Sequence, residues 1–260
     1  MLLEGRAAIV VGVGPGIGRE AALALAREGA DVALGARTED RLRDVAAEVE
    51  ALGRKAIVVP TNIAKEEECA TLADACVQAF GRIDALVQNA FKQPPIRTIE
   101  EESAVEWERA FRINVIGSIS MAKAVLPAMK EQRSGSVVFV SSLSARNSDA
   151  SLGGFAAAKA ALLSVARTMA REWGGYGVRV NSVVPGHVWG PNLQWYFDFL
   201  ARKQGRKPEE VKVEVDALSP LNKIATSEEV AKAILFLASD LSSGMTGQTI
   251  DVNAGAWMPL

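Results

Sequence analysis

The chain has 260 residues, of which 49% are hydrophobic, and a formal net charge of −2. This length and apolar content can bury the core of one α/β domain. The near-neutral, interspersed charge argues against the basic face that nucleic-acid binding needs. No uncharged run approaches the roughly 20 residues of a membrane span, and the first residues lack the apolar region of a signal peptide. We therefore expect a cytoplasmic protein with no nucleic-acid or membrane partner.

The sequence offers few ligands for a metal ion. Its only cysteines are Cys69 and Cys76, and its only histidine is His187. Seven residues apart on a helix, the two cysteines would share a face about two turns apart, too far for a disulfide. We expect small buried thiols in a reducing compartment, and no metal site.

Short apolar runs alternate with helical patterns along the chain. Strands are predicted at Ala7–Val11, Val32–Leu34, Ala56–Val59, Ala85–Val87, Ser136–Val140, Val178–Val183 and Thr249–Val252. Helices are predicted at Gly18–Glu28, Glu39–Leu52, Lys65–Phe80, Ser103–Gln132, Gly154–Trp173 and Ser227–Ala238. Continuously apolar strands are typical of a parallel sheet covered on both faces. The pattern predicts a single Rossmann-like domain over 1–260, an α/β fold with a doubly wound parallel sheet.

Two segments depart from this regular alternation. Pro127 falls inside the longest helical pattern and should bend that helix or end its main part. The segment of about 186–215 is rich in aromatic residues, followed by a polar stretch, and is too long for a plain connector. Long structured loops in compact domains are often lids, so we expect a substrate lid here.

A glycine-rich turn joins the first predicted strand to the first helix. It contains Gly12, Gly14, Gly16, Ile17 and Gly18. Glycines let the backbone turn tightly and approach a pyrophosphate, which then faces the helix N-terminus. Alone, the pattern also fits a tight turn that binds no ligand. If it does bind a dinucleotide, the adjacent Arg19 is a candidate to neutralise phosphate.

The end of the second strand bears on the choice between NAD and NADP. An acidic residue there would bond the ribose 2′-hydroxyl, whereas a basic one would pair with a 2′-phosphate. The chain has Arg37 and no acid at this point. A guanidinium suits bidentate phosphate contact, although Arg37 also fits an ordinary surface helix start. NADP(H) is favoured, and NAD(H) stays an alternative.

Three motifs carry a resemblance to a known family: the glycine turn, Ser141-Ser142, and Phe155-Ala156-Ala157-Ala158-Lys159. Together they resemble the short-chain dehydrogenase/reductase family, whose active site normally reads Tyr-x-x-x-Lys. The resemblance implies that Asn114 holds a water of the proton relay and that Ser142 binds the carbonyl oxygen. It also implies that Lys159 holds the cofactor ribose and supplies positive charge, while Phe155 takes the place of the tyrosine.

The resemblance implies further cofactor contacts along the chain. They fall at Asn62, Ile63, Asn89, Ala90, Lys159, Pro185, Gly186 and Val188. Three positions depart from the family pattern: Gln88 and Phe91 after the fourth strand, and Gly190, where a threonine usually contacts the carboxamide. Phe91 adds bulk beside the ribose or the nicotinamide.

The missing tyrosine affects general acid catalysis. Reduction of a carbonyl leaves charge on oxygen, and a tyrosine beside a cation can exchange the proton near neutral pH. Phenylalanine cannot, so catalysis should be impaired. Three explanations stay open: a tyrosine replaced to trap a complex, a natural non-catalytic dinucleotide-binding protein, or another proton source such as Tyr196 or His187.

Substrate contacts are expected from Ser142, Phe91, Trp189 and Trp195. Such aromatic density is typical of a site for a bulky apolar alcohol or carbonyl compound, although it equally fits lid packing or a subunit contact. Arg146 and Lys92 leave room for an acidic tail on the substrate. The resemblance also implies a homotetramer.

Overall fold

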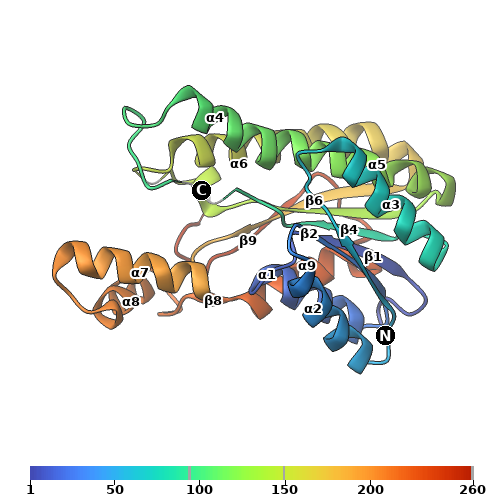
Figure 1. Ribbon diagram of the computed structural model, residues 1–260, viewed down its shortest axis with the longest axis horizontal. Coiled ribbons are helices and arrows are strands. Elements are labelled where there is room, and N and C mark those ends of the chain that lie inside the picture. The colour runs from blue at the N-terminus through green and yellow to red at the C-terminus, as the bar shows by residue number, and fades with distance from the viewer. Residues whose placement is uncertain (93–94, 149, 259–260) are drawn as a thin grey trace.

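A seven-stranded parallel sheet forms the middle layer of the fold (Figure 1). The computed structural model describes residues 1–92, 95–148 and 150–258. The strand order is β3-β2-β1-β4-β5-β6-β9. The strands are β1 (Ala7–Val11), β2 (Asp31–Ala36), β3 (Ala56–Pro60), β4 (Ala85–Gln88), β5 (Gly135–Val140), β6 (Val178–Pro185) and β9 (Thr249–Val252). All seven predicted strands are therefore confirmed, as is the doubly wound Rossmann-like fold.

Helices cover both faces of this sheet (Figure 1). One face carries α1 (Ile17–Arg27), α2 (Glu39–Ala51) and α9 (Ser227–Ala238). The other carries α3 (Glu66–Phe80), α5 (Ser118–Gln132) and α6 (Gly153–Trp173). Short 3₁₀ turns, η2 (Leu143–Ala145), η3 (Gly174–Tyr176) and η4 (Asp240–Ser242), complete the connections.

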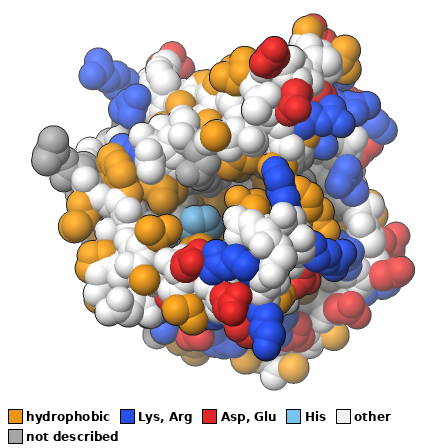
Figure 2. All heavy atoms as spheres, turned by 90° about the vertical axis from the view of Figure 1, so that its left-hand side faces the viewer, with side chains coloured by type: hydrophobic (Ala, Val, Ile, Leu, Met, Phe, Trp, Pro, Cys, Tyr) orange, Lys and Arg blue, Asp and Glu red, His pale blue; other side chains and the backbone are white. Residues whose placement is uncertain are grey.

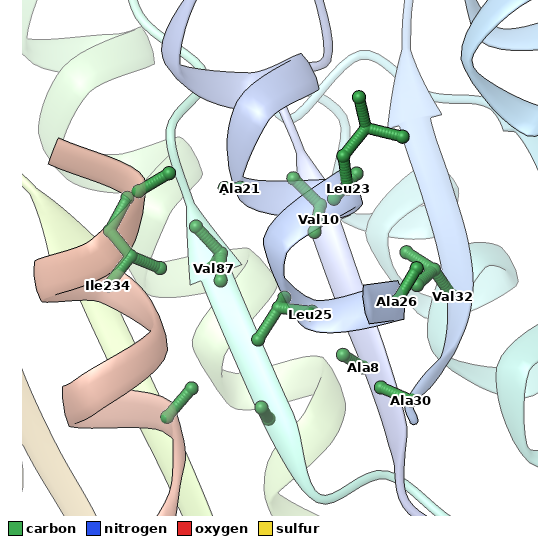
Figure 3. Close-up of a cluster of buried hydrophobic side chains, with 14 of the residues drawn as sticks. Ala8, Val10, Ala21, Leu23, Leu25, Ala26, Ala30, Val32, Val87 and Ile234 are labelled. Atoms are coloured by element: carbon green, nitrogen blue, oxygen red, sulfur yellow. The ribbon is translucent and has the colours of Figure 1, made fainter. Parts of the chain in front are cut away.

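The first strand shows why these runs are apolar throughout. Ala8 and Val10 face the layer of α1, α2 and α9, whereas Ile9 and Val11 face the opposite layer. Successive strand residues point to opposite sides of the sheet, so a strand covered on both sides needs apolar residues at every position. Figure 3 shows Val10 of β1 and Leu25 of α1 in the cluster of buried side chains between the sheet and the layer of α1, α2 and α9. Each such side chain stabilises the fold by about 1.5–3 kcal/mol.

The longest predicted helix is interrupted in the structure. It consists of α4 (Ala104–Phe111), a π-helical segment η1 (Arg112–Gly117) and α5. A capping box between Ser103 and Glu106 begins α4. Pro127 lies inside α5, which continues to Gln132, so the proline does not end the helix. The change of helical geometry instead surrounds Asn114.

The segment expected to be a lid contains regular structure. It includes β7 (Val188–Trp189), α7 (Pro191–Gln204) and α8 (Pro208–Ala217), and β7 pairs with β8 (Ala225–Thr226). This unit projects beyond the sheet (Figure 1). Its own small core contains Leu193, Phe197, Ala201, Val211 and Ile224. Sequence analysis missed both helices, although a proline in the first turn of each is a typical helix-start signal.

The two cysteines are buried on α3, as predicted. Burial raises the pKa of Cys69 to about 11 and that of Cys76 to about 12. Both thiols are therefore protonated at neutral pH. Within the described part of the chain, no helix combines the length and apolar character needed to cross a bilayer.

Candidate active site

The site lies at the carboxyl edge of the sheet, where β1 and β4 are neighbours. From this pair the chain order runs outward in opposite directions, and such a switch point leaves a crevice between the two following loops. The loop after β4 is fixed to the turn after β1 because Asn89 Nδ2 donates a 2.8 Å hydrogen bond to the carbonyl of Gly12. Figure 2 views this side of the molecule, which is hollowed near its centre and lined by hydrophobic side chains.

Two glycines of the turn are required by close backbone approach. A Cβ on Gly12, whose φ is 87°, would lie 2.2 Å from the Ala90 nitrogen. A Cβ on Gly18 would lie 2.4 Å from the Gly12 carbonyl oxygen. Gly16 precedes α1 at a φ of 123° and supplies no side-chain cap. The first amides of α1 are therefore left for water or an anion. A Cβ on Gly14 would meet nothing within 4 Å, so packing does not require that glycine.

A cavity of about 570 Å³ opens beside this turn. Of the predicted cofactor residues, its walls include Gly12, Arg37, Asn62, Ile63, Asn89 and Ala90. The wall residues Val13, Thr38, Arg41, Arg109 and Ile113 were not predicted, and Lys92 was expected only beside the substrate. Arg41 had a recognisable signal, because it is a second basic residue close after Arg37, in the first turn of α2.

The Asn62 side chain is positioned by the loop that follows β3. Its Oδ1 accepts a 3.1 Å hydrogen bond from the Ala64 amide, while the main-chain amide of Asn62 donates to the Glu68 carboxylate at 2.7 Å. A carbonyl oxygen has two lone pairs. One acceptor position of Asn62 thus remains for a ligand.

The charge in the cavity wall is positive. Arg37 and Arg41 are exposed and line the wall, and no Asp or Glu is found among its described residues. Neighbouring Arg43 differs, since it pairs with Glu39 outside the cavity. Arg19 does not fill the phosphate role expected of it, because its guanidinium is held by Glu20 and Glu48.

Phe155 and Lys159 lie one turn apart on α6, as the sequence spacing predicted. Lys159 is 2% exposed, and its Nζ donates a 2.8 Å hydrogen bond to the carbonyl of Val140 at the end of β5. The Nζ also lies 5.7 Å from the centroid of the Phe155 ring and 5.8 Å from that of Phe91. It has no ion-pair partner among the described residues. Burial lowers the pKa of this amine to about 7.

Ser142 follows β5 and begins η2. Its Oγ accepts from the Ser144 amide at 3.2 Å and lies 3.3 Å from the Ser144 hydroxyl. These contacts orient the side chain while one hydroxyl proton can still be turned toward a ligand. The preceding Ser141 bonds the Lys159 carbonyl at 3.0 Å and so ties β5 to α6.

Asn114 is fully buried within the π-helical segment. Its Oδ1 accepts from the Lys92 amide at 3.2 Å, and its main-chain carbonyl accepts from Ser118 Oγ at 2.8 Å. Gln88 donates to the same Ser118 hydroxyl at 2.7 Å, which explains the polar residue at this buried strand end. Among the residues that the structure describes, Asn114 Nδ2 and Gln88 Oε1 have no hydrogen-bond partner. Since buried polar groups are usually satisfied, these atoms mark a place for a water molecule or a ligand.

Pro185, Gly186 and Val188 mark the end of β6 and the start of the projecting unit. A Cβ on Gly186 would lie 2.8 Å from the Asn253 side chain, so the two loops are in close contact here. Val188 pairs with Ala225 in the short β7–β8 ribbon. None of these three residues is among the described walls of the cavity.

The predicted substrate aromatics separate into two groups. Phe91 meets Phe155 edge-on with ring centroids 6.3 Å apart. Trp189 instead packs on Phe197 and beneath Lys212, as part of the small core of α7 and α8. Trp195 is 55% exposed and stacks on Phe199.

One of the two cations proposed for an acidic tail on the substrate already has an acidic partner. Arg146 forms a 3.1 Å ion pair with Asp251 and lies 5.1 Å from the centre of the Trp257 ring. This pairing leaves Arg146 poorly suited to bind an acidic tail on a substrate.

Comparison with known proteins gives consistent matches over the whole chain. A family model described as enoyl-(acyl carrier protein) reductase matches residues 12–256. The chain is 33% identical to the 3-oxoacyl-(acyl-carrier-protein) reductase FabG of Thermotoga maritima, over 98% of this chain and 99% of that protein.

Solved structures agree with this match. NAD⁺-bound xylitol dehydrogenase has a TM-score of 0.92 at 27% identity, covering 98% of this chain and 100% of that one. A 7α-hydroxysteroid dehydrogenase complexed with NADH and 7-oxo glycochenodeoxycholic acid has a TM-score of 0.87 at 29% identity, with coverages of 97% and 94%. Because both the sequence match and the fold extend over nearly its full length, the chain belongs to the short-chain dehydrogenase/reductase family of oxidoreductases.

Proposed function

We propose that this protein is an NADP(H)-dependent oxidoreductase that interconverts a secondary alcohol and a carbonyl compound. The observation that carries the proposal is the cavity at the switch point of the sheet, whose wall contains Arg37 and Arg41 and no described carboxylate. A positive wall favours a ligand with a phosphate at this end.

The residues present fit a dinucleotide. Gly12 lines the cavity, and the uncapped start of α1 beside it offers amides to a pyrophosphate. Asn62 and Ile63 would border the adenine, and Lys159 would hold the ribose next to the nicotinamide. Two solved neighbours bind NAD⁺ and NADH, so NAD(H) is the competing cofactor.

Bound there, the dinucleotide would supply or accept the hydride. Ser142 would orient the carbonyl oxygen through its hydroxyl. Lys159 would place a positive charge beside the oxygen that becomes negative, which is the usual form of electrostatic stabilisation. Phe155 has no proton to give, so catalysis is impaired at the step of proton transfer.

Removal of the Arg37 guanidinium will weaken the binding of NADP⁺ more than the binding of NAD⁺. Charge-assisted hydrogen bonds contribute about 1.5–3 kcal/mol, so we expect Arg37→Ala to raise the dissociation constant of NADP⁺ by roughly ten- to a hundredfold. Isothermal titration calorimetry would measure both nucleotides. Arg43→Ala is the matched control, because Arg43 lies on α2, shortly after Arg37, but pairs with Glu39. Equal affinities for NADP⁺ and NAD⁺ in the unmodified protein would contradict the assignment.

The substrate is proposed to be bulky and apolar. Phe91 and Phe155 present rings at the reacting end of the site, and Trp195 is exposed on α7. The unit of β7, α7 and α8 would then close over the substrate as a lid. This unit is held by its own small core and projects from the sheet, which favours independent motion.

Hydrogen exchange tests the lid. We expect amides of α7 and α8 to exchange faster than those of β4 and β5 in the free protein, and to slow when NADP⁺ and an apolar ketone are added. Mass spectrometry of exchanged peptides would report both. Protection as strong as that of the sheet without ligand would mean that the aromatics are fixed packing, and Trp195 would lose its place as a substrate contact.

Assembly as a homotetramer is also part of the proposal. Val105 on α4 and Ile116 on η1 are 60% and 57% exposed, which gives this side of the molecule apolar surface suited to a subunit contact. A second candidate function is a non-catalytic dinucleotide-binding protein. The absence of an ionisable group at Phe155 favours it, and activity measured after its replacement decides between the two.

A further inference from the structure

The Lys159 ammonium is enclosed on all sides that the structure describes. On the sheet side it donates to the Val140 carbonyl at 2.8 Å. The rings of Phe155 and Phe91 lie 5.7 Å and 5.8 Å from its Nζ, inclined at 61° to each other. Lys159 is 2% exposed, whereas Phe91 is 41% exposed. Phe91 is therefore the outer of the groups that cover the amine.

The cavity at the switch point reaches the same ring. Its described walls extend from Arg37 past Asn89 and Ala90 to Phe91, continue with Lys92, Arg109 and Ile113, and include neither Ser142, Phe155 nor Lys159. The cavity is thus open on the side of the proposed adenosine half, whereas the Lys159 amine is covered. Phe91 belongs both to the cavity wall and to that cover.

The backbone that carries Phe91 is held on both sides. Before it, Ala90 packs so closely on Gly12 that a Cβ on Gly12 would lie 2.2 Å from the Ala90 nitrogen. After it, the Lys92 amide donates to Asn114 Oδ1 at 3.2 Å. Rotation of the Phe91 side chain, rather than movement of the loop, is therefore the change that would uncover Lys159.

We propose that Phe91 is the residue that sets affinity for the nicotinamide half of the dinucleotide, because its ring must leave Lys159 before that half can bind. This inference rests on the proposed function. The adenosine half binds without any such change. The energy of the ring–ring and cation–ring contacts that must be broken is lost from the affinity for the whole dinucleotide.

Two ligands distinguish binding of the adenosine half from binding of the nicotinamide half of the dinucleotide. We expect Phe91→Ala to bind NADP⁺ about five- to tenfold more tightly than the unmodified protein, while adenosine 2′,5′-bisphosphate, which lacks the nicotinamide riboside, binds equally to both. Calorimetry would give both constants. Tyr176→Ala is the matched control. Tyr176 is 39% exposed, and the centroid of its ring lies 4.1 Å from the Lys130 Nζ. It precedes β6 and so lies at the opposite edge of the sheet.

Chemical labelling tests the cover itself. Trinitrobenzenesulfonate should modify Lys159 slowly in the unmodified protein and at least about tenfold faster in Phe91→Ala, as measured by mass spectrometry of peptides, since reactivity follows access to the amine. Tyr176→Ala should leave the Lys159 rate unchanged.

The possible results have separate meanings. Weaker or unchanged NADP⁺ binding by Phe91→Ala, with the bisphosphate still bound, would overturn the inference and leave the proposed function standing. Failure of the bisphosphate to bind the unmodified protein would contradict the proposed function. In that case an unchanged labelling rate of Lys159 would overturn the inference as well, and a faster rate would support the part of it that concerns the cover.

Discussion

Phe155→Tyr will raise turnover at least about a hundredfold, the lower end of what general acid catalysis contributes. The substitution adds one hydroxyl to a ring whose centroid lies 5.7 Å from the Lys159 amine. A neighbouring cation lowers the pKa of a phenol, so the new group would exchange a proton nearer to neutral pH. Ser142 and Asn114 are already in place at the family spacing. The assay follows nicotinamide absorbance over a panel of apolar ketones and secondary alcohols.

Two further variants make this result specific. Phe80→Tyr adds the same hydroxyl at the end of α3, away from the site, and should not change turnover. Adding Lys159→Met to Phe155→Tyr should remove most of the gain, because the cation beside the phenol is lost. If Phe155→Tyr folds, binds NADP⁺ and stays inactive across the panel, the second candidate function, that of a non-catalytic binder, becomes the better account.

The stability of the protein relative to Lys159→Met will rise by a few kcal/mol between pH 7 and pH 10. Burial lowers the pKa of Lys159 to about 7 in the folded protein, whereas in the unfolded chain the usual value is about 10.4. Below pH 7 the amine is protonated in both states, and the cost of burying a cation is fully present. Above pH 7 the unfolded state holds more protons, so the free energy of unfolding increases by at most about 1.4 kcal/mol per pH unit.

Urea unfolding of both proteins at several pH values would measure this difference. Other titrating groups are common to the two proteins and cancel when the difference is taken. A constant difference for Lys159→Met would mean that its amine remains charged in the folded state.

The sequence by itself determined the sheet, most of the helices and the glycine turn. Strands such as Ala7–Val11 were readable because a strand covered on both faces must be apolar at every position. The turn at Gly12 was readable because close backbone approach excludes any side chain. The contacts come from distant segments, but the residue types that they demand occupy a few consecutive positions, so a local pattern records them. The one-turn spacing of Phe155 and Lys159 was likewise a local property of α6.

Only the tertiary structure decided which polar side chains pair with one another and which remain for a ligand. Arg19 and Arg146 looked free to meet a ligand in the sequence, but Glu48 and Asp251, distant along the chain, pair with them. The helix pattern around Asn114 gave no sign of a π-helical segment, which depends on packing with neighbouring elements. Phe91 was predicted as extra bulk and as a substrate contact, whereas its place over Lys159 follows from the meeting of the loop after β4 with α6. Contacts between segments far apart in the chain have no periodicity that a single sequence displays, and for that physical reason the covered amine emerged only from the fold.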